Sequence, residues 1–380
     1  MKNAFFFLLG GFLFFTMQSC ADKIDDTLYH YTSEEYQTLT QHLNLPEGTY
    51  DYSIVTNVPV QVDTDLPFHK ATLGRVLFYD KMLSVDESTS CASCHKQELA
   101  FADDKTFSEG LEGQIGTRNS LPLGNTIGFV RYYGTDLLFP SGQFSWDESQ
   151  PSINDQSRAA IVSPIEMGHE MHELVDLVKQ QDYYEVLFKK VYGDNGINET
   201  NLLDALTEFV NSFSSRESKF DKAVAESGTP HSSLSMFTQS ENRGRELFNT
   251  SCGSCHDVNH NAIITSAANN GLDIVYADKG MGGKTFKSSD EGVFKVPSLR
   301  NIELTGPYMH DGRFETLEEV VDHYSTGIKN HKNLSQFLKA GNQPRSFNFS
   351  ASDKTAIVDY LKTLTDQEFI TAVKYSDPFK

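Results

Sequence analysis

Positive charge is scarce in this sequence: 32 lysines and arginines stand against 52 aspartates and glutamates, giving a formal net charge of −20 at pH 7. Such a surface repels a phosphate backbone, which excludes a nucleic-acid binder. Beyond the N-terminal leader the chain also lacks any apolar run that approaches the ~20 residues of a membrane-spanning helix. Patterns typical of β-strands are sparse as well, so we expect a mainly α-helical fold.

Cysteine is also scarce, with five in the chain, but four of them lie in two runs of the form Cys-x-x-Cys-His. These runs contain Cys91, Cys94 and His95, and Cys252, Cys255 and His256. In such a run the thiols add to the vinyl groups of a haem and the histidine ligates the iron. Zinc sites and redox dithiols also use paired cysteines. The histidine that follows both pairs favours two covalently bound haems c, and hence electron transfer.

The fifth cysteine, Cys20, ends an N-terminal leader whose apolar stretch runs from Ala4 to Met17. About 14 apolar residues cannot cross a bilayer that needs roughly 20, so residues 1–19 are predicted to be an export signal peptide. The position of Cys20 after Ser19 resembles a bacterial lipobox and predicts lipidation, which would hold the protein at a membrane in the periplasm or cell envelope. An unlipidated leader is the alternative. Export agrees with haem attachment, because c-type haem is attached outside the cytoplasm.

A short internal repeat precedes the two cysteine runs. Residues 73–78 read Leu-Gly-Arg-Val-Leu-Phe, and residues 243–248 read Arg-Gly-Arg-Glu-Leu-Phe. Both are typical of an amphipathic helix, and the second follows a capping box at residues 238–241. The repeat predicts two cytochrome c-like helical haem domains with long loops.

The composition of residues 225–235 is that of a linker, which suggests a domain boundary there. We expect a tether and extension over residues 20–66, an N-terminal haem domain over 67–230 and a C-terminal haem domain over 231–380. The last helix could pack back on the first domain. Apolar residues at helical spacing between the cysteine runs predict core-facing helices: Leu174, Leu177, Tyr184, Leu187, Phe188 and Val191, and Leu202, Leu206, Phe209, Val210 and Phe213.

Further motifs follow in a fixed order: Ala100-Phe101-Ala102-Asp103, Arg118-Asn119-Ser120, Trp146-Asp147, Glu166-Met167-Gly168 and the run from Thr305 to Gly312. Together with the cysteine runs they resemble the bacterial di-haem cytochrome c peroxidases, which include the MauG-type enzymes. The resemblance extends from about residue 67 to near the C-terminus. It implies an N-terminal haem at which peroxide reacts and a C-terminal haem that receives electrons, with His95 and His256 as the proximal ligands.

The resemblance also implies roles for single residues. Glu166 matches the family's pocket glutamate, which acts as general base and then acid on H2O2. Without the resemblance, Glu166 would be interpreted as an acidic residue near the start of a helix. Gln156 matches a glutamine that orients peroxide on the same side. Trp146, the only tryptophan, matches a residue that relays electrons between the haems in the family. The alternative interpretation is a buried aromatic residue that anchors the packing.

The family also holds a calcium ion between the haems, through one asparagine side chain, backbone carbonyls and water. Such hard oxygen ligands suit Ca²⁺. Asn125 matches the asparagine, and Thr305 and Pro307 match the carbonyl donors, so we expect one Ca²⁺ on the strength of the resemblance alone.

One departure from the family concerns the loop before Arg118. Many members carry a histidine there that blocks the peroxidatic iron until the other haem is reduced. Residues 108–116 contain no histidine, and Leu111 stands at or near that position. An aliphatic side chain cannot ligate iron, so we predict a five-coordinate N-terminal haem. His69 could fold back as a ligand, but an incidental helix histidine is the favoured interpretation.

A second departure concerns the sixth ligand of the C-terminal haem. Peroxidases with a high-potential haem place a methionine there, and a thioether raises the potential. The matching position here is Tyr324, and tyrosine is the ligand of MauG-type enzymes. Met309 and His323 are the rivals, and Tyr324 could also pack against the haem without ligating it.

Two further points concern charged and metal-binding side chains. Family members usually continue the Trp-Asp pair with Gly-Arg, whereas this chain has Glu148 and Ser149. If the family's arginine contacts a haem propionate, its loss must be offset elsewhere. His169 and His172 invite a metal site, but surface histidines on the first turn of a helix are the favoured interpretation.

These residues predict an exported oxidoreductase of the cytochrome c peroxidase type. It would reduce H2O2 with electrons from a small c-type cytochrome or cupredoxin, which pass through the C-terminal haem and Trp146. One alternative is a MauG-like enzyme that uses high-valent haem to oxidise residues of a partner protein. Another is a di-haem electron carrier without catalysis. The sequence leaves a homodimer open.

Overall fold

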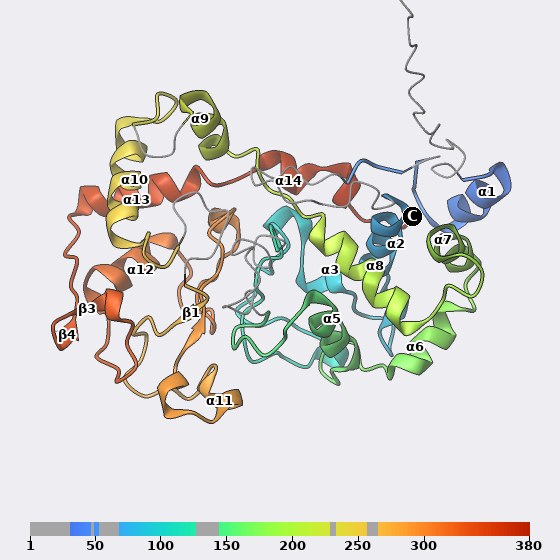
Figure 1. The fold of residues 1–380 in the computed structure, drawn as a ribbon, viewed down its shortest axis with the longest axis horizontal. Helices are drawn as coiled ribbons and strands as arrows, with labels where there is room; N and C mark the ends of the chain where they lie inside the picture. Colours follow the sequence, from blue (N-terminus) through green and yellow to red (C-terminus); the bar gives the residue numbers. More distant parts are fainter. Residues whose placement is uncertain (1–30, 47–48, 53–67, 127–143, 229–232, 257–264) are drawn as a thin grey trace, which may run out of the picture.

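The computed structural model describes residues 31–46, 49–52, 68–126, 144–228, 233–256 and 265–380. The predicted leader and Cys20 lie outside these residues, as does most of the predicted tether. The described chain forms two helical units side by side along the longest axis (Figure 1). The prediction of a mainly α-helical fold with two cytochrome c-like domains is confirmed. None of the described helices is both long and apolar enough to cross a membrane.

The first unit is built from helices that precede and follow the first cysteine run. Its elements are α1 (Ser33–His42), α2 (Phe68–Tyr79), η2 (Lys81–Leu83), α3 (Cys91–Cys94), η3 (Gln97–Leu99), η4 (Leu111–Gly113), α5 (Ile153–Val162), α6 (Met171–Val178), α7 (Asp182–Tyr192) and α8 (Glu199–Asn211). The apolar residues predicted to face the core occur on α6, α7 and α8, with Phe213 just after α8, and most of them are buried.

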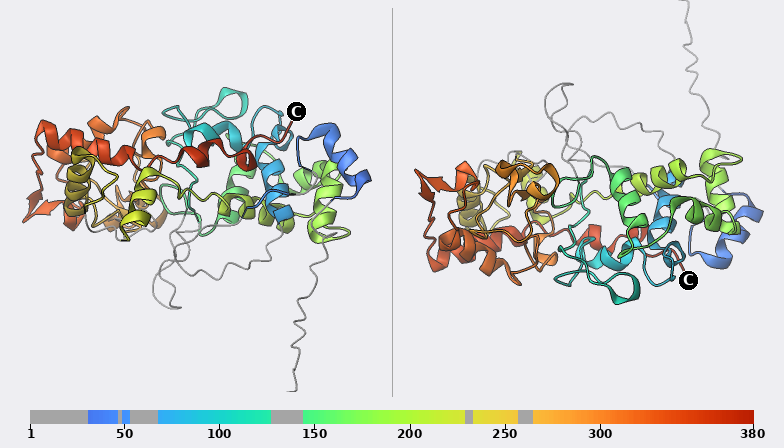
Figure 2. Two further views of the ribbon diagram at one scale, coloured as in Figure 1. Left: turned by 90° about the horizontal axis from the view of Figure 1, so that it is seen from above. Right: turned by 90° about the horizontal axis from the view of Figure 1, so that it is seen from below.

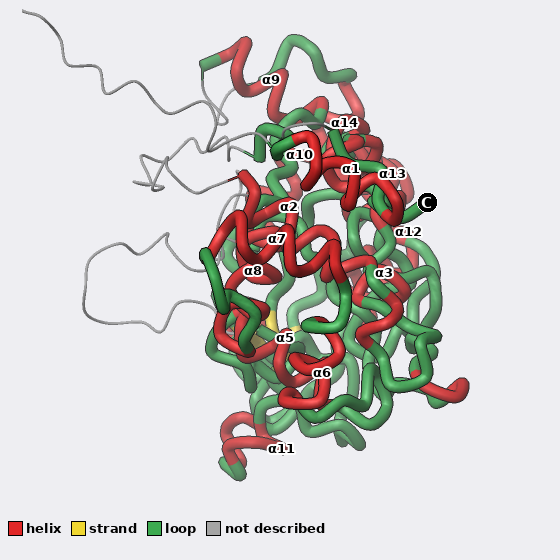
Figure 3. Tube along the Cα trace, turned by 90° about the vertical axis from the view of Figure 1, so that its right-hand side faces the viewer, coloured by secondary structure: helices red, strands yellow, loops and turns green. Residues whose placement is uncertain are grey.

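The second unit has fewer long helices than the first. In the end-on view from the side of the first unit, α5, α6, α7 and α8 lie at the front (Figure 3). The helices of the second unit are α9 (Lys219–Ser227), α10 (Gln239–Ser251), α11 (Gly282–Thr285), η5 (Ser288–Asp290), η6 (Ile302–Leu304), α12 (Leu317–Asp322), the π-helical turn η7 (His323–Gly327), η8 (Gln336–Leu338) and α13 (Ala351–Lys362). Its strands form two antiparallel pairs, β1 (Ala267–Ala268) with β2 (Phe294–Lys295) and β3 (Lys339–Ala340) with β4 (Gln343–Pro344). The last elements of the chain are α14 (Gln367–Thr371) and η9 (Val373–Tyr375).

The internal repeat forms the same helix packing in both units. A Cβ at Gly74 of α2 would lie 2.0 Å from the carbonyl oxygen of Ala205 on α8. A Cβ at Gly244 of α10 would lie 1.8 Å from the carbonyl oxygen of Ala356 on α13. In each unit glycine lets the helix before the cysteine run touch the backbone of a second helix, so the repeat is maintained by close packing.

Two main hydrophobic cores correspond to the two units. The first contains buried side chains of α2, α7 and α8, and the second contains buried side chains of α10, α12 and α13. Phe220 and Ala223 of α9 belong to the second core, so the cores divide slightly before the predicted boundary at residue 230. Phe369 of α14 and Tyr375 belong to the first core, and Figure 2 shows this C-terminal segment crossing to the first unit.

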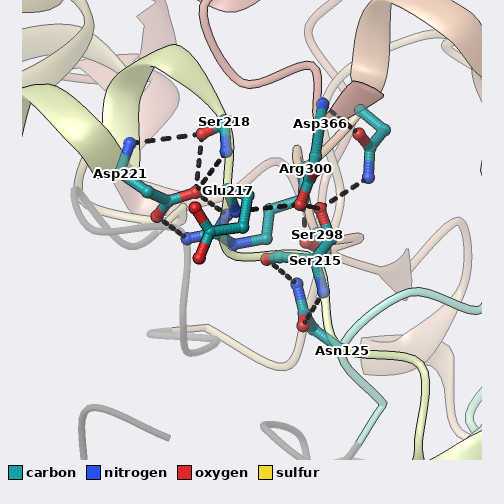
Figure 4. A network of polar contacts seen from close by, with 9 residues as sticks. Asn125, Ser215, Glu217, Ser218, Asp221, Ser298, Arg300 and Asp366 are labelled. Atoms are coloured by element: carbon teal, nitrogen blue, oxygen red, sulfur yellow. Dashed lines mark hydrogen bonds and ion pairs between the residues drawn. The ribbon is translucent and has the colours of Figure 1, made fainter. Parts of the chain in front are cut away.

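A polar network lies where the two units meet (Figure 4). Ser215 donates its backbone N–H to Oδ1 of Asn125 at 3.0 Å and accepts from Nδ2 of Asn125 at 3.1 Å. Its hydroxyl donates to Asp366 at 3.0 Å, and Asp366 is only 1% exposed. Arg300 forms a two-point ion pair with Asp221 at 2.8 and 2.7 Å. Hydrogen bonds to buried charged groups contribute about 1.5–3 kcal/mol each, so this network ties the units together.

Candidate functional site

The first cysteine run forms the single turn α3, which places His95 directly after it. The Nδ1 atom of His95 donates to the carbonyl oxygen of Phe101 at 2.8 Å, and the hydroxyl of Ser120 lies 3.3 Å from the same nitrogen. Burial lowers the pKa of His95, which keeps the imidazole neutral. A neutral ring whose Nδ1–H is bonded to a carbonyl presents Nε2 as the metal ligand. His95 therefore has the form expected of a proximal haem ligand.

The second cysteine run follows α10 and repeats this arrangement. The Nδ1 atom of His256 donates to the carbonyl oxygen of Pro297 at 3.2 Å. Burial lowers the pKa of His256 to about 4, so this imidazole is neutral as well. This arrangement leaves its Nε2 available to ligate a metal in the same way.

A large cavity adjoins the second run. Its empty space, with the open solvent at its mouth included, is about 1490 Å³. Cys252, Cys255 and His256 line it, and most of its other walls are apolar side chains. A haem attached to the two cysteines would fit this cavity, with its iron held by His256.

Glu166 lies on a turn after α5 that neighbouring segments hold from several sides. The hydroxyl of Thr89 donates to the carbonyl oxygen of Glu166 at 3.0 Å. The N–H of Val85 donates to the carbonyl oxygen of Met167 at 2.9 Å, and the N–H of Leu111 donates to that of Ile165 at 2.8 Å. These bonds leave little freedom for the backbone that presents the Glu166 carboxyl group.

The Glu166 carboxyl group lies near the first haem-attachment turn. Its side chain is accessible to solvent, yet the surrounding protein desolvates the carboxylate enough to raise the pKa of Glu166. Burial raises the pKa of the Cys91 and Cys94 thiols, and the charge of Glu166 contributes to both shifts. A carboxyl group with a raised pKa beside a haem-attachment turn is suited to transfer protons there.

Gln156 on α5 is oriented by the segment that carries the tryptophan. Its Oε1 accepts a hydrogen bond from the hydroxyl of Ser145 at 2.5 Å. Since Oε1 is engaged, the Nε2 amide is the group of Gln156 that remains for another acceptor.

The loop without a histidine packs against the turn that carries Glu166. A Cβ on Gly168 would lie 2.7 Å from Cδ1 of Leu111 and 3.1 Å from Cγ1 of Val85, so these two side chains contact that glycine. Leu111 is buried, and it offers no ligand atom. His69 lies in the first turn of α2 with its ring against that of Tyr31 at 4.8 Å between centroids. That position agrees with an incidental helix histidine.

Trp146 links the second cavity to the first haem-attachment turn. Its ring lines the cavity, and its Nε1–H donates to the carbonyl oxygen of Asn119 at 2.8 Å. The next residue, Ser120, donates to the carbonyl oxygen of Cys94 at 3.0 Å and lies within 3.3 Å of Nδ1 of His95. One hydrogen bond and one peptide unit therefore connect the indole to a residue that contacts both Cys94 and His95.

Arg118 positions the segment that carries Trp146. Its Nη1 lies 2.8 Å from a carboxylate oxygen of Asp147, and its Nε and Nη2 bind Asp278 at 2.7 and 2.9 Å. Burial works to raise the pKa of both aspartates, but the hydrogen bonds and charge of Arg118 outweigh it and hold both pKa values below the usual range. Arg118 thus joins the motifs Arg-Asn-Ser and Trp-Asp to the second unit.

Two of the three candidate sixth ligands line the second cavity, namely Tyr324 and Met309. Burial raises the pKa of Tyr324, and a hydrogen bond from Asn270 opposes that shift. Nδ2 of Asn270 also lies 3.4 Å from Sδ of Met309, so one amide contacts both candidates. His323 is absent from the cavity wall, and its Nε2 lies 3.1 Å from the carbonyl oxygen of Asn270.

The three residues predicted to bind calcium lie in two settings. Asn125 is buried in the polar network of Figure 4, with both side-chain atoms bonded to Ser215. Thr305 and Pro307 line the second cavity, on either side of the cis bond between Gly306 and Pro307. The amide oxygen of Asn125 keeps a second lone pair for a cation. The calcium site stays a prediction.

Some residues of this site escaped sequence reasoning. Lys295 and Asn270 both line the second cavity, and nothing in their sequence context marks them. Of the two histidines considered for a metal, His172 is exposed and His169 is half-buried. No group of three or more His, Cys, Asp or Glu side chains in the described part of the chain is arranged to hold a metal ion.

Comparison with known proteins agrees with this geometry. Residues 68–229 match the di-haem cytochrome c peroxidase family, and residues 241–365 match the cytochrome c family. The chain is 30% identical over 318 residues to the methylamine utilization protein MauG of Methylorubrum extorquens, covering 81% of this chain and 81% of that protein. It is 30% identical over 319 residues to the cytochrome c551 peroxidase of Nitrosomonas europaea, covering 82% and 84% respectively.

Among solved structures, a MauG-like protein associated with microbial copper homeostasis superposes with a TM-score of 0.71 at 29% identity, covering 87% of this chain and 99% of that one. The diheme peroxidase BthA from Burkholderia thailandensis shares the fold with a TM-score of 0.63 at 19% identity. Two haem-attachment turns on one helical framework, together with these relatives, place the chain in the di-haem cytochrome c peroxidase family of c-type haem oxidoreductases.

Proposed function

We propose that this protein reduces H2O2 to water with electrons from a small c-type cytochrome or cupredoxin. The observation that carries the proposal is the position of Glu166, a carboxyl group with a raised pKa on a turn held beside the first haem-attachment residues. An electron carrier would have no use for a proton-transferring group at this place.

The residues around the first haem would divide the work. A c-type haem supplies an iron that binds peroxide and exchanges single electrons. Glu166 takes a proton from one peroxide oxygen and returns it to the other, which leaves as water. Gln156 orients the peroxide with its free amide. Two electrons and two protons complete the reduction of one H2O2 to two waters.

Electrons would enter at the second unit and leave it through Trp146. The indole lines the second cavity, and its hydrogen bond to Asn119 leads to Ser120 beside His95. Trp146 would relay electrons over a gap that is too long for one direct step. In the same proposal, Cys20 carries the lipid that holds the protein in the periplasm or cell envelope, and Asn125, Thr305 and Pro307 bind one Ca²⁺.

A MauG-like oxidation of a partner protein is the second candidate. Two observations favour it: the loop at residues 108–116 carries no histidine, and Tyr324 lines the second cavity. A tyrosinate ligand would lower the potential of the C-terminal haem, whereas a thioether from Met309 would raise it. We propose Tyr324 as the ligand, so Tyr324→Met should raise that potential and Met309→Leu should leave it unchanged.

Steady-state consumption of H2O2 with a reduced c-type cytochrome separates the candidates. Fast turnover supports the peroxidase. An oxidised state that persists without turnover of the cytochrome supports the MauG-like enzyme, and no reaction with H2O2 leaves only the electron carrier. Electron paramagnetic resonance of the oxidised protein adds an independent check. One high-spin and one low-spin haem would support the open N-terminal site, and two low-spin haems would contradict it.

A further inference from the structure

The second cavity contains one strongly basic side chain. Among the residues that line it, Lys295 is the only lysine, arginine, aspartate or glutamate. A haem carries two propionate carboxylates, and a carboxylate in an apolar cavity is costly unless a cation or hydrogen-bond donors meet it. Lys295 is the lining residue that can supply that cation.

Lys295 is held in place by the sheet and by the tryptophan segment. It lies on β2 opposite Ala267 of β1, and its backbone N–H donates to the carbonyl oxygen of Trp146 at 2.8 Å. Lys295 is only 5% exposed. Burial lowers the pKa of Lys295 to about 8, and the charge of Glu148 opposes this shift. Burial of this kind favours a negative group beside the ammonium.

Glu148 is an acidic residue whose charge acts on Lys295, and together with Ser149 it stands where the family usually has Gly-Arg. It is 8% exposed, and its backbone has a positive φ of 51°. Its Oε2 has one long contact of 3.5 Å with the hydroxyl of Ser266, and its Oε1 is buried without a hydrogen-bond partner in the described structure. Burial raises the pKa of Glu148, and the charge of Lys295 opposes that shift. A buried carboxylate oxygen without a donor indicates that the charge of Lys295 is its main compensation.

We propose that Lys295 pairs with a propionate of the C-terminal haem and that the nearby carboxylate of Glu148 offsets part of the positive charge of Lys295. A cation beside the propionates favours the reduced haem, because reduction adds negative charge near it. The pair thus helps to set the potential at which electrons reach Trp146.

This inference rests on the haem that the family assignment places in the second cavity, and it is independent of the peroxide chemistry. Its test is the midpoint potential of each haem, measured by optical titration of the holoprotein at one pH. Peroxidase activity is recorded separately, so its loss bears on the proposed function and leaves this test intact. Haem content by mass spectrometry shows whether each variant holds both haems.

Lys295→Met removes the charge at similar length and should make the reduced C-terminal haem about tenfold less favoured, a shift of ~59 mV to lower potential. Lys295→Arg should keep the wild-type potential.

Glu148→Gln removes a negative charge without changing the shape of the side chain and should raise the potential. This rise should be smaller in the double variant that also carries Lys295→Met. The N-terminal haem should not respond to any of them. Lys284→Met, at an exposed lysine of α11, is the matched control and should change neither haem.

Equal potentials in Lys295→Met and the Lys284→Met control would overturn the proposal, as would equal shifts of both haems. A Glu148→Gln effect that is undiminished in the double variant would overturn the role assigned to Glu148, because it would show that Glu148 acts on the haem without Lys295. If Lys295→Met loses its second haem, the potentials of Lys295→Arg and Glu148→Gln provide the test instead. A wild-type potential in Lys295→Arg with a raised one in Glu148→Gln supports the pair, and no rise in Glu148→Gln contradicts it.

Discussion

The two haem-attachment turns of this protein are built alike and surrounded differently. Each follows a helix with a tightly packed glycine, and each places a neutral histidine whose Nδ1 is bonded to a carbonyl. The first turn lies near Glu166, whose backbone segment is held in place by hydrogen bonds. The second faces a largely apolar cavity with Tyr324, Met309 and one buried lysine.

The difference shows that the attachment motif alone does not decide what a haem does. The histidine of each motif bonds to a carbonyl oxygen in both units, whereas the other residues around each motif come from different and distant segments. A proton-transferring carboxyl group suits chemistry on a substrate, and an apolar cavity suits storage and passage of electrons. Three changes test this contrast.

The largest expected effect is that of Glu166→Gln. Loss of a general base and acid lowers rates by about 10²–10⁴-fold, so kcat/KM for H2O2 should fall in that range. Because the pKa of Glu166 is raised, the wild-type rate should decline on acidification at a higher pH than an ordinary glutamate would cause, and Glu166→Gln should lack that decline. Stopped-flow mixing with H2O2 across pH measures both.

The matched control is Glu170→Gln, which changes an exposed glutamate at the start of α6 and should keep the wild-type rate. The absorption spectrum of the C-terminal haem should be the same in both variants. If Glu166→Gln retains the full rate, peroxide does not react beside this carboxyl group and the contrast between the two units loses its chemical meaning.

An intermediate effect is expected for Trp146→Phe, which removes the indole N–H bonded to Asn119 and a readily oxidised ring. Electron transfer between the haems should slow by about tenfold, equivalent to ~1.4 kcal/mol of barrier. Re-oxidation of the C-terminal haem after mixing the reduced protein with H2O2 reports this step. Tyr276→Phe changes an aromatic residue of the same hydrophobic cluster and serves as the control. Equal rates in the two variants would show that Trp146 is only a packing anchor.

Arg118→Gln should change the reaction rate least. Its main effect should be on the stability of the fold. Arg118 binds Asp147 and Asp278, and its loss leaves the nearly buried Asp147 without its cation, so the free energy of unfolding should fall by about 2 kcal/mol. The lowered pKa of each aspartate makes this contribution complete above pH ~4 and progressively lost below it.

Urea unfolding at pH 7 and at pH 3 should therefore show a smaller difference between wild type and Arg118→Gln at the lower pH. Arg243→Gln breaks exposed ion pairs on α10 and should cost under ~1 kcal/mol. A cost for Arg118→Gln no larger than that of Arg243→Gln would mean that this arginine does not hold the tryptophan segment.

Much of the fold could be predicted from local patterns. The repeats around Gly74 and Gly244, the capping box at Thr238 and the apolar stripes of α8 depend on neighbours within one or two helical turns. The π-helical turn that carries Tyr324 could not be predicted in this way, because its residues follow α12 without a local signal for the change. The contact between Lys295 and the segment that carries Trp146 and Glu148 escaped prediction for a similar reason, since β2 and that segment meet only in the folded chain.

The sequence by itself determined the two haem-attachment motifs, the histidine that follows each pair of cysteines and the helices that precede them, because each depends on residues a few positions apart. Which side chains lie near each motif was decided only by tertiary structure. The turn that carries Glu166 is held by hydrogen bonds from Thr89, Val85 and Leu111, and Lys295 lines the second cavity from a strand pair. Long-range packing has no local signature, and it is what makes two similar motifs unequal.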